Sequence, residues 1–252
     1  MNQNWNSKQY TENFAFVHQY GNDVVGLIDM TDVSSILDLG CGNGALSKHF
    51  AAQGLSVTGM DASEDMLAVA RKAYPDITFL HGDATSFGLE QPVDVVFSNA
   101  VFHWIEKERQ PLMMQCVHRA LKEHGQFVFE MGGHGNNRRI HAALEKAFAQ
   151  QGLAYTMPFC FPTIGEYSAL LEASGFQITH AFLFDRPTVL EGADGLSDWI
   201  HMFISKPFDG IPDATKEVLI ASTVSELKPV LYRDGHWQAD YVRLRMRAIK
   251  RE

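Results

Sequence analysis

The first half of the chain alternates short, mostly apolar runs with segments whose apolar residues recur at helical spacing. The apolar runs have the length and composition of buried strands and cover residues 36–39, 55–60, 77–80, 93–97 and 127–131. The clearest helical pattern runs from Leu112 to Leu121, and Gly125 is expected to end that helix. Strands and helices that alternate in this way predict right-handed crossovers and a mainly parallel sheet covered on both faces.

Local signals mark where several elements begin and end. Gly54 is expected to close the first helix in a left-handed conformation, and Ser63 is expected to cap the second. Thr163 and Glu166 form a capping box at the start of a later helix that ends at Gly175. The remaining expected elements are helices at 136–151, 193–204 and 212–227, a sixth strand at 176–186, and a hairpin around 234–235 that leads into the last strand.

The chain is predicted to form a single domain, because no linker rich in Pro, Gly or Ser interrupts it after Gly132. We divide it into an N-terminal lid segment (1–33), a cofactor-binding core (34–132), cap helices with the sixth strand (133–228) and a closing hairpin strand (229–252). The lid segment is rich in aromatic residues, so we expect it to close over a ligand while it packs on the sheet.

Composition and charge narrow the classes of partner. The 252 residues carry 21 Lys and Arg against 30 Asp and Glu, a formal charge of −9, which disfavours nucleic acid as the main ligand. Three scattered cysteines fit a reducing cytoplasm better than a disulfide framework or a zinc cage. No signal peptide and no long apolar run is present, so no membrane is expected. We expect a cytoplasmic monomer or weak dimer that acts on a small molecule without a metal.

The turn after the first strand is the most specific feature of the sequence. Residues 40–44 read Gly-Cys-Gly-Asn-Gly, which fits either a dinucleotide turn or an S-adenosylmethionine turn, because glycines let the chain pass close to a ligand. Asp38 lies two residues before the first glycine and faces the crevice beyond the carboxyl ends of the strands. Its carboxylate would repel a pyrophosphate, whereas it suits the ammonium group and the sulfonium of S-adenosylmethionine.

Two further carboxylates are placed at strand ends. Asp61 ends the second strand, 17 residues after Gly44, where it can accept hydrogen bonds from two ribose hydroxyls of either cofactor. Asp83 ends the third strand, where it can accept a hydrogen bond from the exocyclic amine of adenine; NAD has no need of this second acid. Met66 can pack on the adenine face or belong to the core. The three carboxylates together favour S-adenosylmethionine over NAD.

These residues resemble the motifs of the class I S-adenosylmethionine-dependent methyltransferases. The similar segments are Ile-Leu-Asp-Leu-Gly-Cys-Gly-Asn-Gly at 36–44, Val-Thr-Gly-Met-Asp at 57–61, His-Gly-Asp-Ala at 81–84 and Phe-Ser-Asn-Ala-Val-Phe-His-Trp at 97–104. The resemblance spans about residues 34–131 and implies a Rossmann-like, doubly wound α/β fold, with seven mostly parallel strands, an antiparallel last strand and a helical cap. It also implies S-adenosyl-L-methionine as cofactor and S-adenosyl-L-homocysteine as product.

The resemblance assigns cofactor roles by position. Asp38, the glycines and Asn99 would line the methionine end, Asp61 would hold the ribose, and Asp83 with Ala84 would hold the adenine. The full set of expected cofactor-binding residues is Tyr20, Asp38, Gly40, Cys41, Gly42, Asn43, Gly44, Asp61, Ala62, Met66, Asp83, Ala84, Asn99 and Ala100.

The flanking sequence resembles a narrower group, the trans-aconitate methyltransferase-like branch (methyltransferase type 11). The segments that carry this resemblance are residues 5–21, 97–104, 184–192, 198–200 and 240–245. The branch implies a small-molecule acceptor, with a carboxylate as one candidate and a phenol, an amine or a carbon centre as the others. Residues 98–101 read Ser-Asn-Ala-Val in place of Asn-Pro-Pro-Tyr, which argues against a nucleobase amine or a protein glutamine as acceptor.

Methyl transfer is an in-line displacement, so the site mainly has to align donor and acceptor and exclude water. His103 is the candidate catalytic base for an acceptor that must lose a proton; alternatively it packs against the lid or hydrogen-bonds the cofactor. A catalytically silent binding module is the alternative to an enzyme. The candidate substrate-binding residues are His103, Trp104, His134, Trp199 and Phe203.

The last strand carries Arg243, Arg245 and Arg247 on one face and apolar residues on the other. Three cations on the face of a strand inside a sheet should not be buried without partners. Either they pair with helix carboxylates, or one of them reaches the pocket and holds an anionic substrate.

Overall fold

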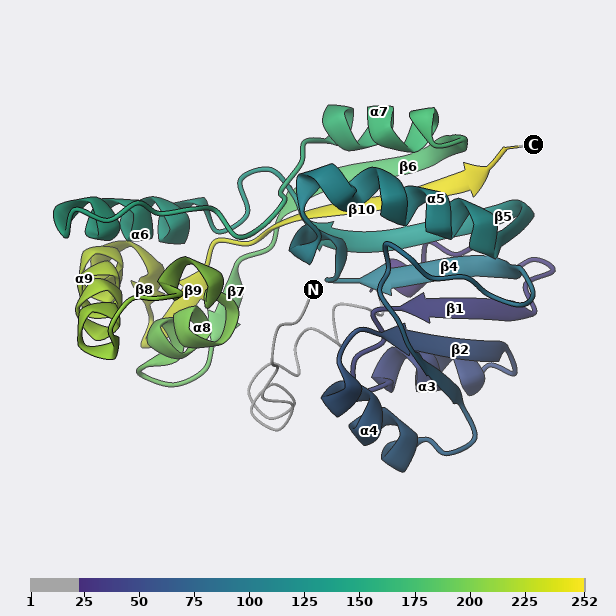
Figure 1. The fold of residues 1–252 in the computed structure, drawn as a ribbon, viewed down its shortest axis with the longest axis horizontal. Helices are drawn as coiled ribbons and strands as arrows, with labels where there is room; N and C mark the ends of the chain where they lie inside the picture. Colours follow the sequence, from purple (N-terminus) through teal and green to yellow (C-terminus); the bar gives the residue numbers. More distant parts are fainter. Residues whose placement is uncertain (1–22, 252) are drawn as a thin grey trace. The chain divides into compact units, whose positions relative to one another are not determined.

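A computed structural model describes residues 23–251 of the chain, which form two compact units (Figure 1). Unit 1 comprises residues 23–131, 162–183 and 244–251, and unit 2 comprises residues 132–161 and 184–243. Unit 1 therefore takes the segment 162–183, which the sequence analysis assigned to the cap. That the whole chain is a single domain stays a prediction.

Unit 1 is built on a seven-stranded sheet, most of whose strands run parallel (Figure 1). The strands are β1 (Ser35–Leu39), β2 (Ser56–Asp61), β3 (Thr78–His81), β4 (Val93–Asn99), β5 (Leu121–Gly132), β6 (Phe176–Asp185) and β10 (Val242–Lys250). Their order is β3-β2-β1-β4-β5-β10-β6, and β10 is the antiparallel strand. The predicted fold class is confirmed.

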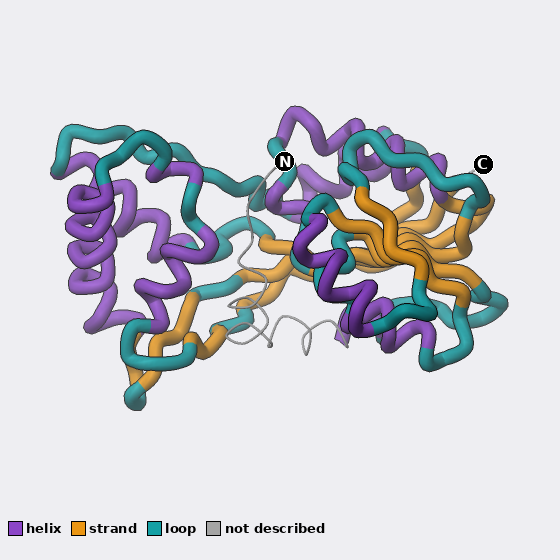
Figure 2. The backbone as a smooth tube through the Cα atoms, turned by 60° about the horizontal axis from the view of Figure 1, so that its bottom comes forward, coloured by secondary structure: helices purple, strands orange, loops and turns teal. Residues whose placement is uncertain are grey.

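Helices cover both faces of this sheet (Figure 2). Those of unit 1 are α3 (Ala45–Ala51), α4 (Glu64–Ala73), α5 (Gln110–Ala120) and α7 (Ile164–Ala173), with short 3-10 turns η1 (Phe102–Trp104) and η2 (Lys107–Arg109). On one face the ring of Phe97 in β4 packs against that of Phe50 in α3, with 5.0 Å between the ring centroids. On the other face Phe127 and Phe129 of β5 join a buried cluster with residues of α5 and α7. Apolar side chains thus cover both faces of the sheet where these helices pack on it.

Several predicted starts and ends of helices are confirmed. Gly54 adopts φ +85° after α3, and the Ser63 hydroxyl accepts a hydrogen bond from Met66 N at the start of α4. Thr163 and Glu166 make both bonds of the capping box before α7. These ends follow from local chemistry, since a left-handed glycine or a capping side chain satisfies backbone groups that the helix leaves free.

The prediction that Gly125 ends a helix was wrong. Helix α5 already ends at Ala120, and β5 begins at the next residue with an irregular register against β4. A Cβ atom on Gly125 would lie 2.8 Å from the carbonyl oxygen of Lys122 and 3.2 Å from that of Asp94. Glycine is therefore required by the tight path of the chain at the start of β5 and by its approach to β4, which a pattern of apolar residues does not reveal.

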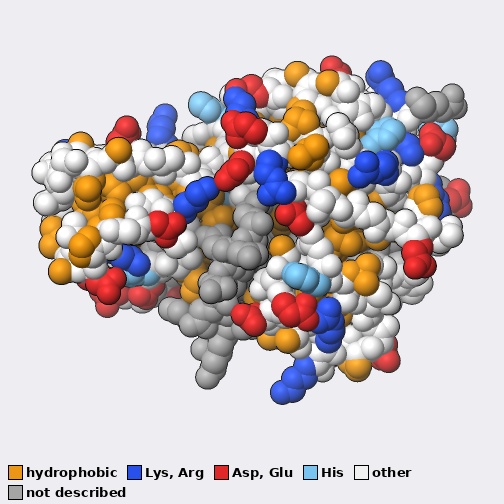
Figure 3. Space-filling view, viewed as in Figure 1, with side chains coloured by type: hydrophobic (Ala, Val, Ile, Leu, Met, Phe, Trp, Pro, Cys, Tyr) orange, Lys and Arg blue, Asp and Glu red, His pale blue; other side chains and the backbone are white. Residues whose placement is uncertain are grey.

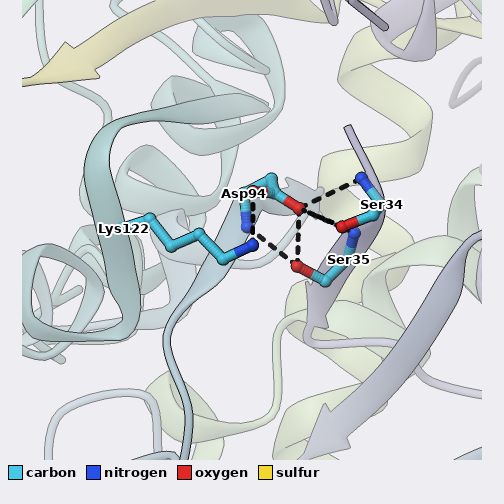
Figure 4. A network of polar contacts seen from close by, with 4 residues as sticks. All are labelled: Ser34, Ser35, Asp94 and Lys122. Carbon is cyan, nitrogen blue, oxygen red and sulfur yellow. Dashed lines mark hydrogen bonds and ion pairs between the residues drawn. The ribbon is translucent and has the colours of Figure 1, made fainter. Parts of the chain in front are cut away.

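The start of the sheet is tied together by one carboxylate (Figure 4). Oδ2 of Asp94 accepts hydrogen bonds from the backbone nitrogens and hydroxyls of Ser34 and Ser35, at 2.7–3.0 Å. Its Oδ1 accepts one from Lys122 Nζ at 2.7 Å. Partial burial alone would raise the pKa of Asp94, but Lys122 and the two serines hold it well below its usual range. The carboxylate thus links the chain entering β1 to β4 and β5.

Unit 2 combines three helices with a small sheet. The elements are α6 (Arg138–Gln150), α8 (Gly195–Phe203), α9 (Asp213–Leu231) and an antiparallel sheet of β7 (Thr188–Leu190), β8 (Tyr232–Arg233) and β9 (His236–Ala239), in the order β7-β9-β8. The predicted turn at 234–235 is present and joins β8 to β9, so the expectation that the last strand, which begins at Val242, belongs to this hairpin was wrong. The reason is that β9 pairs with β7 instead, and Trp237 of β9 is buried with its indole N–H donating to Ala193 O at 2.8 Å.

Two partly buried arginines of β10 have carboxylate partners. Arg245 Nη2 lies 2.7 Å from Glu130 Oε2 of β5 and 3.8 Å from a carboxylate oxygen of Asp23. Arg247 Nη2 lies 3.6 Å from a carboxylate oxygen of Asp29. The pairing alternative therefore describes these two residues, although Glu130 belongs to a strand and not to a helix.

Within residues 23–251, no helix has the combination of length and apolar character that crossing a membrane requires. On the face drawn in Figure 3, the Lys and Arg side chains are scattered among Asp and Glu side chains. Binding to a phosphate backbone depends on clustered cations. The described residues of this face do not form such a cluster.

Candidate active site

A cavity opens in unit 1 where the carboxyl ends of β1, β2 and β4 meet. The crevice beyond these strand ends is the usual ligand site of an open α/β sheet. The predicted site residues that line the cavity are Asp38, Gly40, Cys41, Gly42, Asp61, Ala62, Met66, Asp83, Ala84, Asn99, Ala100 and Trp104. The structure therefore brings together, in one cavity, residues that are up to 66 positions apart in the sequence.

The glycine turn forms one wall of the cavity. Gly40 adopts φ +80°, and a Cβ atom there would lie 2.2 Å from the side chain of Val101. The backbone nitrogens of Gly40 and Cys41 donate to the carbonyl oxygen of Met60 at 2.7 and 3.0 Å. Gly42 N donates to Asp61 Oδ2 at 2.8 Å. The turn is thus fixed to β2 by its backbone, and its missing side chains leave the cavity open.

Asp38 is buried at the end of β1, and its carboxylate accepts a hydrogen bond from the Ser47 hydroxyl at 2.6 Å. Burial raises the pKa of Asp38 to about 7, and the neighbouring charge of Asp61 adds to this effect, while the bond from Ser47 opposes it. Near neutral pH this group is therefore poised between its acid and its anion. A cation in the cavity would favour the anion.

Asp61 is held in place by the backbone on both sides. Besides the bond from Gly42 N, Oδ1 of Asp61 accepts a hydrogen bond from Ser63 N at 2.8 Å. Burial raises the pKa of Asp61, and these backbone donors lower it in part. Each oxygen keeps a lone pair for a further donor, so the pair of oxygens can accept from two adjacent hydroxyl groups.

Asp83 differs from the other two carboxylates because it has a cationic partner. Burial alone would raise its pKa, but hydrogen bonds from Thr85 and Arg109 hold the pKa of Asp83 below its usual value. Arg109 Nη2 lies 3.2 Å from Asp83 Oδ2. The sequence analysis missed Arg109, because it lies 26 residues from Asp83 and no local pattern connects the two.

Cys41 lies in the cavity wall with its thiol buried. Burial, followed by the charges of Asp38 and Asp61, raises the pKa of this thiol far above its usual range. A protonated, buried thiol is a poor nucleophile. Cys41 therefore acts as a neutral, compact part of the wall.

Some predicted site residues lie away from the cavity lining. Asn43 and Gly44 belong to the turn, where Asn43 Oδ1 accepts from Ala45 N at 3.3 Å, but they do not line the cavity. His103 is buried in η1 next to Trp104, with 5.5 Å between ring centroids, and only Trp104 of the two reaches the lining. The role of His103 as a base stays a prediction.

The predicted substrate residues on unit 2 are described within that unit. His134 is exposed, whereas Trp199 and Phe203 are buried on α8 with 5.4 Å between their rings. The indole N–H of Trp199 donates to the Tyr241 hydroxyl at 2.7 Å. Contact of these three residues with a substrate stays a prediction. Tyr20 lies outside the described residues.

The cavity also has lining residues that were not among the predicted site residues. Most are apolar or small, and their signal was only that of buried strand or helix positions. They are Leu39, Leu46, Met60, Ser63, Gly82, Val101 and Ile105. Together with Met66 they give the cavity apolar surfaces between its three carboxylates.

Comparisons with known proteins agree with this geometry. Residues 36–125 match a family described as a methyltransferase domain. The chain is 31% identical over 257 residues to an uncharacterised methyltransferase of Schizosaccharomyces pombe, with 98% of each protein covered. It is 26% identical over 213 residues to trans-aconitate 2-methyltransferase of Methylobacterium nodulans, with 81% of each covered. The solved structure of an S-adenosylmethionine-dependent methyltransferase from Mesorhizobium loti matches with a TM-score of 0.55 and 23% identity, over 91% of this chain and 96% of that one.

Proposed function

The chain belongs to the class I S-adenosylmethionine-dependent methyltransferases, in the branch of the trans-aconitate methyltransferases, and we propose that it transfers the methyl group to a small carboxylate. When bound, S-adenosylmethionine supplies an electrophilic methyl group on its sulfonium. The residues of the cavity then have three tasks, which are to hold the donor, to align the acceptor and to exclude water.

The cavity fits the donor by the chemistry of its lining. Asp38 at the methionine end would hold the ammonium group. Burial disfavours the ionised form of Asp38, and a bound cation would stabilise that form. Asp61 would accept from the ribose hydroxyls, and Asp83 from the adenine amine. The side chains of Met66 and Ile105 would form apolar walls for the adenosine. A pyrophosphate bound along the glycine turn would meet these carboxylates with no cationic side chain among the described lining residues, which disfavours a dinucleotide, whereas a carboxylate acceptor would lie next to the positive sulfonium of the bound donor.

The observation that carries the proposed acceptor is the absence of a nitrogen base from the lining. Among the described lining residues there is no histidine and no lysine, and the one thiol is held protonated. A carboxylate is already ionised near neutral pH and can attack without losing a proton, whereas a phenol or an ammonium group needs a base. The relative from Methylobacterium nodulans is named for trans-aconitate, which is itself a carboxylate.

The proposal is tested by incubating the full chain with methyl-labelled S-adenosylmethionine and a panel of acceptors. The panel contains small di- and tricarboxylates, trans-aconitate among them, and phenols and amines of similar size. We expect label in the carboxylates only. Because a methyl ester is cleaved by mild alkali and a methyl ether or methylamine is not, the labelled product should release labelled methanol on alkaline treatment.

The test variant is Asp61→Ala, which removes the carboxylate proposed to bind the ribose hydroxyls. It should weaken donor binding and lower the labelling of every compound in the panel. Ala52, which caps α3 away from the cavity, provides the matched change Ala52→Ser and should leave both unchanged. Alkali-stable label in a phenol or an amine, with none in the carboxylates, would overturn the proposed acceptor and leave the methyltransferase assignment intact.

A further inference from the structure

Arg109 stands behind the adenine end of the cavity without lining it. It is the last residue of η2, and its side chain is 37% exposed. Its guanidinium donates through Nη2 to Asp83 Oδ2 at 3.2 Å and also to the hydroxyl oxygen of Thr85. One cation therefore contacts both Asp83, which lines the cavity, and Thr85, which does not.

Asp83, Thr85 and Arg109 each form a hydrogen bond with the other two. Thr85 donates to Asp83 Oδ1 twice, from its backbone nitrogen at 2.8 Å and from its hydroxyl at 2.7 Å. Oδ1 thus accepts two hydrogen bonds from Thr85, while Oδ2 accepts one from Arg109. The carboxylate cannot rotate about its Cβ–Cγ bond without breaking at least two of these hydrogen bonds.

Asp83 is the exception among the carboxylates of the cavity. In the described part of the chain, Asp83 forms an ion pair with Arg109, whereas Asp38 accepts from a hydroxyl and Asp61 accepts from backbone nitrogens. A guanidinium on Oδ2 keeps the group ionised and therefore restricts it to accepting hydrogen bonds. An acceptor fixed in orientation can distinguish a donor from another acceptor.

We infer that Arg109 is a positioning residue that makes the adenine end selective for a base bearing an exocyclic amine. This inference rests on the proposed contact between Asp83 and adenine. Adenine presents an N–H donor to the fixed Oδ2, whereas hypoxanthine presents a carbonyl oxygen at the same position. Two facing acceptors repel, so the fixed carboxylate rejects hypoxanthine. Without Arg109, Thr85 still holds Oδ1, but Oδ2 loses its donor and can move away from that oxygen, which weakens the repulsion.

The test compares two ligands that differ only at this atom, S-adenosylhomocysteine and S-inosylhomocysteine. Their dissociation constants are measured by isothermal titration for the wild type, Arg109→Met, Arg109→Lys and Arg71→Met. We expect Arg109→Met to weaken S-adenosylhomocysteine by roughly tenfold and to leave S-inosylhomocysteine unchanged or slightly tighter, so that the preference narrows by about that factor. Arg109→Lys keeps the charge without the two-pronged geometry and should give an intermediate ratio.

Arg71→Met is the matched control, because Arg71 is half exposed like Arg109 and pairs with Glu64, which does not line the cavity. It should leave the ratio of the two affinities unchanged. If both Arg109 variants keep the wild-type ratio, or weaken both ligands equally, Arg109 is only a surface ion pair and the inference is wrong. If Arg109→Met shows no cooperative unfolding transition and is therefore not folded, the comparison is made with Arg109→Lys alone.

Asp83→Asn separates this inference from the proposed function beneath it. An amide can donate to hypoxanthine, so this variant should lose the preference for adenine whatever Arg109 does. If Asp83→Asn keeps the preference, the proposed contact between Asp83 and adenine is wrong. If the wild type binds neither ligand, the proposed donor site itself is wrong.

Discussion

At the scale of single residues, the cavity depends on carboxylates whose surroundings treat them differently. Asp38 and Asp61 are buried without a cation, and burial raises the pKa of each. Asp83 has Arg109 beside it and stays ionised. Asp38, whose ionisation is disfavoured by burial, thus lies where the proposed ligand brings positive charge. This arrangement makes ligand binding sensitive to pH.

The affinity for S-adenosylhomocysteine is expected to rise with pH on the acid side of neutrality. In the ligand-free protein the pKa of Asp38 is about 7, and a bound ammonium group lowers it, so binding below that pH must expel a proton. The affinity should therefore increase by up to about tenfold per pH unit until about pH 7 and then level off. Isothermal titration across this range measures the slope. Asp38→Asn should bind more weakly and show a flat profile, and a wild-type profile equally flat would contradict the argument.

His103 provides a second residue-scale prediction. It is buried in η1 and does not line the cavity, so a carboxylate acceptor should not depend on it for proton removal. We expect His103→Gln to change the rate of carboxylate methylation by less than about threefold. The assay uses enough donor to give the variant the melting temperature of the wild type. A loss of about a hundredfold or more, with unchanged donor affinity, would instead assign it the role of a base.

At the scale of elements, the glycine turn between β1 and α3 and the carboxylate network at the start of β1 lie at opposite ends of the same strand. One end leaves room for a ligand, and the other joins three strands (Figure 4). Changes at the two ends should therefore separate binding from stability.

Gly40→Ala tests the turn against Gly54→Ala. Both glycines have a left-handed φ, of +80° and +85°, but a Cβ atom meets Val101 at 2.2 Å in the first and nothing within 4 Å in the second. Gly54→Ala should cost about 1 kcal/mol from backbone strain alone and leave donor binding intact. Gly40→Ala should cost more and weaken donor binding at least about tenfold. Equal losses of stability and unchanged binding in both variants, measured by urea unfolding and titration, would refute the steric account.

Asp94→Asn tests the network at the other end of the strand. An amide keeps the size of the carboxylate but loses the charge that pairs with Lys122 and one oxygen acceptor. We expect the free energy of unfolding to fall by about 1–2 kcal/mol, with donor affinity unchanged. Asp76→Asn, an exposed carboxylate, is the matched control and should stay within about 0.5 kcal/mol of the wild type. A loss of donor affinity without a loss of stability would contradict this assignment.

At the scale of the whole molecule, the two units contain buried groups with opposite pH dependence. In unit 1, the raised pKa of Asp38 stabilises the fold at low pH, and this contribution is lost as the pH rises through about 7. In unit 2, His141 of α6 is buried against the Tyr155 hydroxyl at 2.7 Å, and burial lowers the pKa of His141 to about 4. Its contribution is present above its unfolded pKa and is lost as the pH falls toward 4.

Hydrogen exchange resolved by peptide can measure this for each unit separately. Relative to Asp38→Asn, the wild-type peptides of unit 1 should become less protected as the pH rises from about 4 to about 7. Relative to His141→Gln, the wild-type peptides of unit 2 should become more protected over the same range. Parallel trends in the two units would show that one of these groups is not buried in the way described.

Much of the large sheet could be predicted because its evidence is local. Apolar runs, a capping serine and three carboxylates at strand ends each occupy a few adjacent positions, and parallel α/β topology brings strand ends together. The missed features are non-local. Arg109 pairs with Asp83, which lies 26 residues away in the sequence, and β9 pairs with β7 instead of with a strand of the large sheet. Gly125 is structurally required, as the sequence indicated, but not as a helix end. Glycine is favoured both at helix ends and where backbone segments lie close together, so the sequence alone does not separate the two cases.

The burial of Asp38 has a consequence for how ligands can be found. In the ligand-free protein, its ionisation works against the fold, and a cationic ligand removes that penalty. The melting temperature should thus respond to the charge of the bound ligand: at equal concentration, S-adenosylmethionine, with its sulfonium and ammonium, should bind more tightly than adenosine and raise the melting temperature more. A melting screen near neutral pH can in this way rank compounds by the charge that they bring to the crevice.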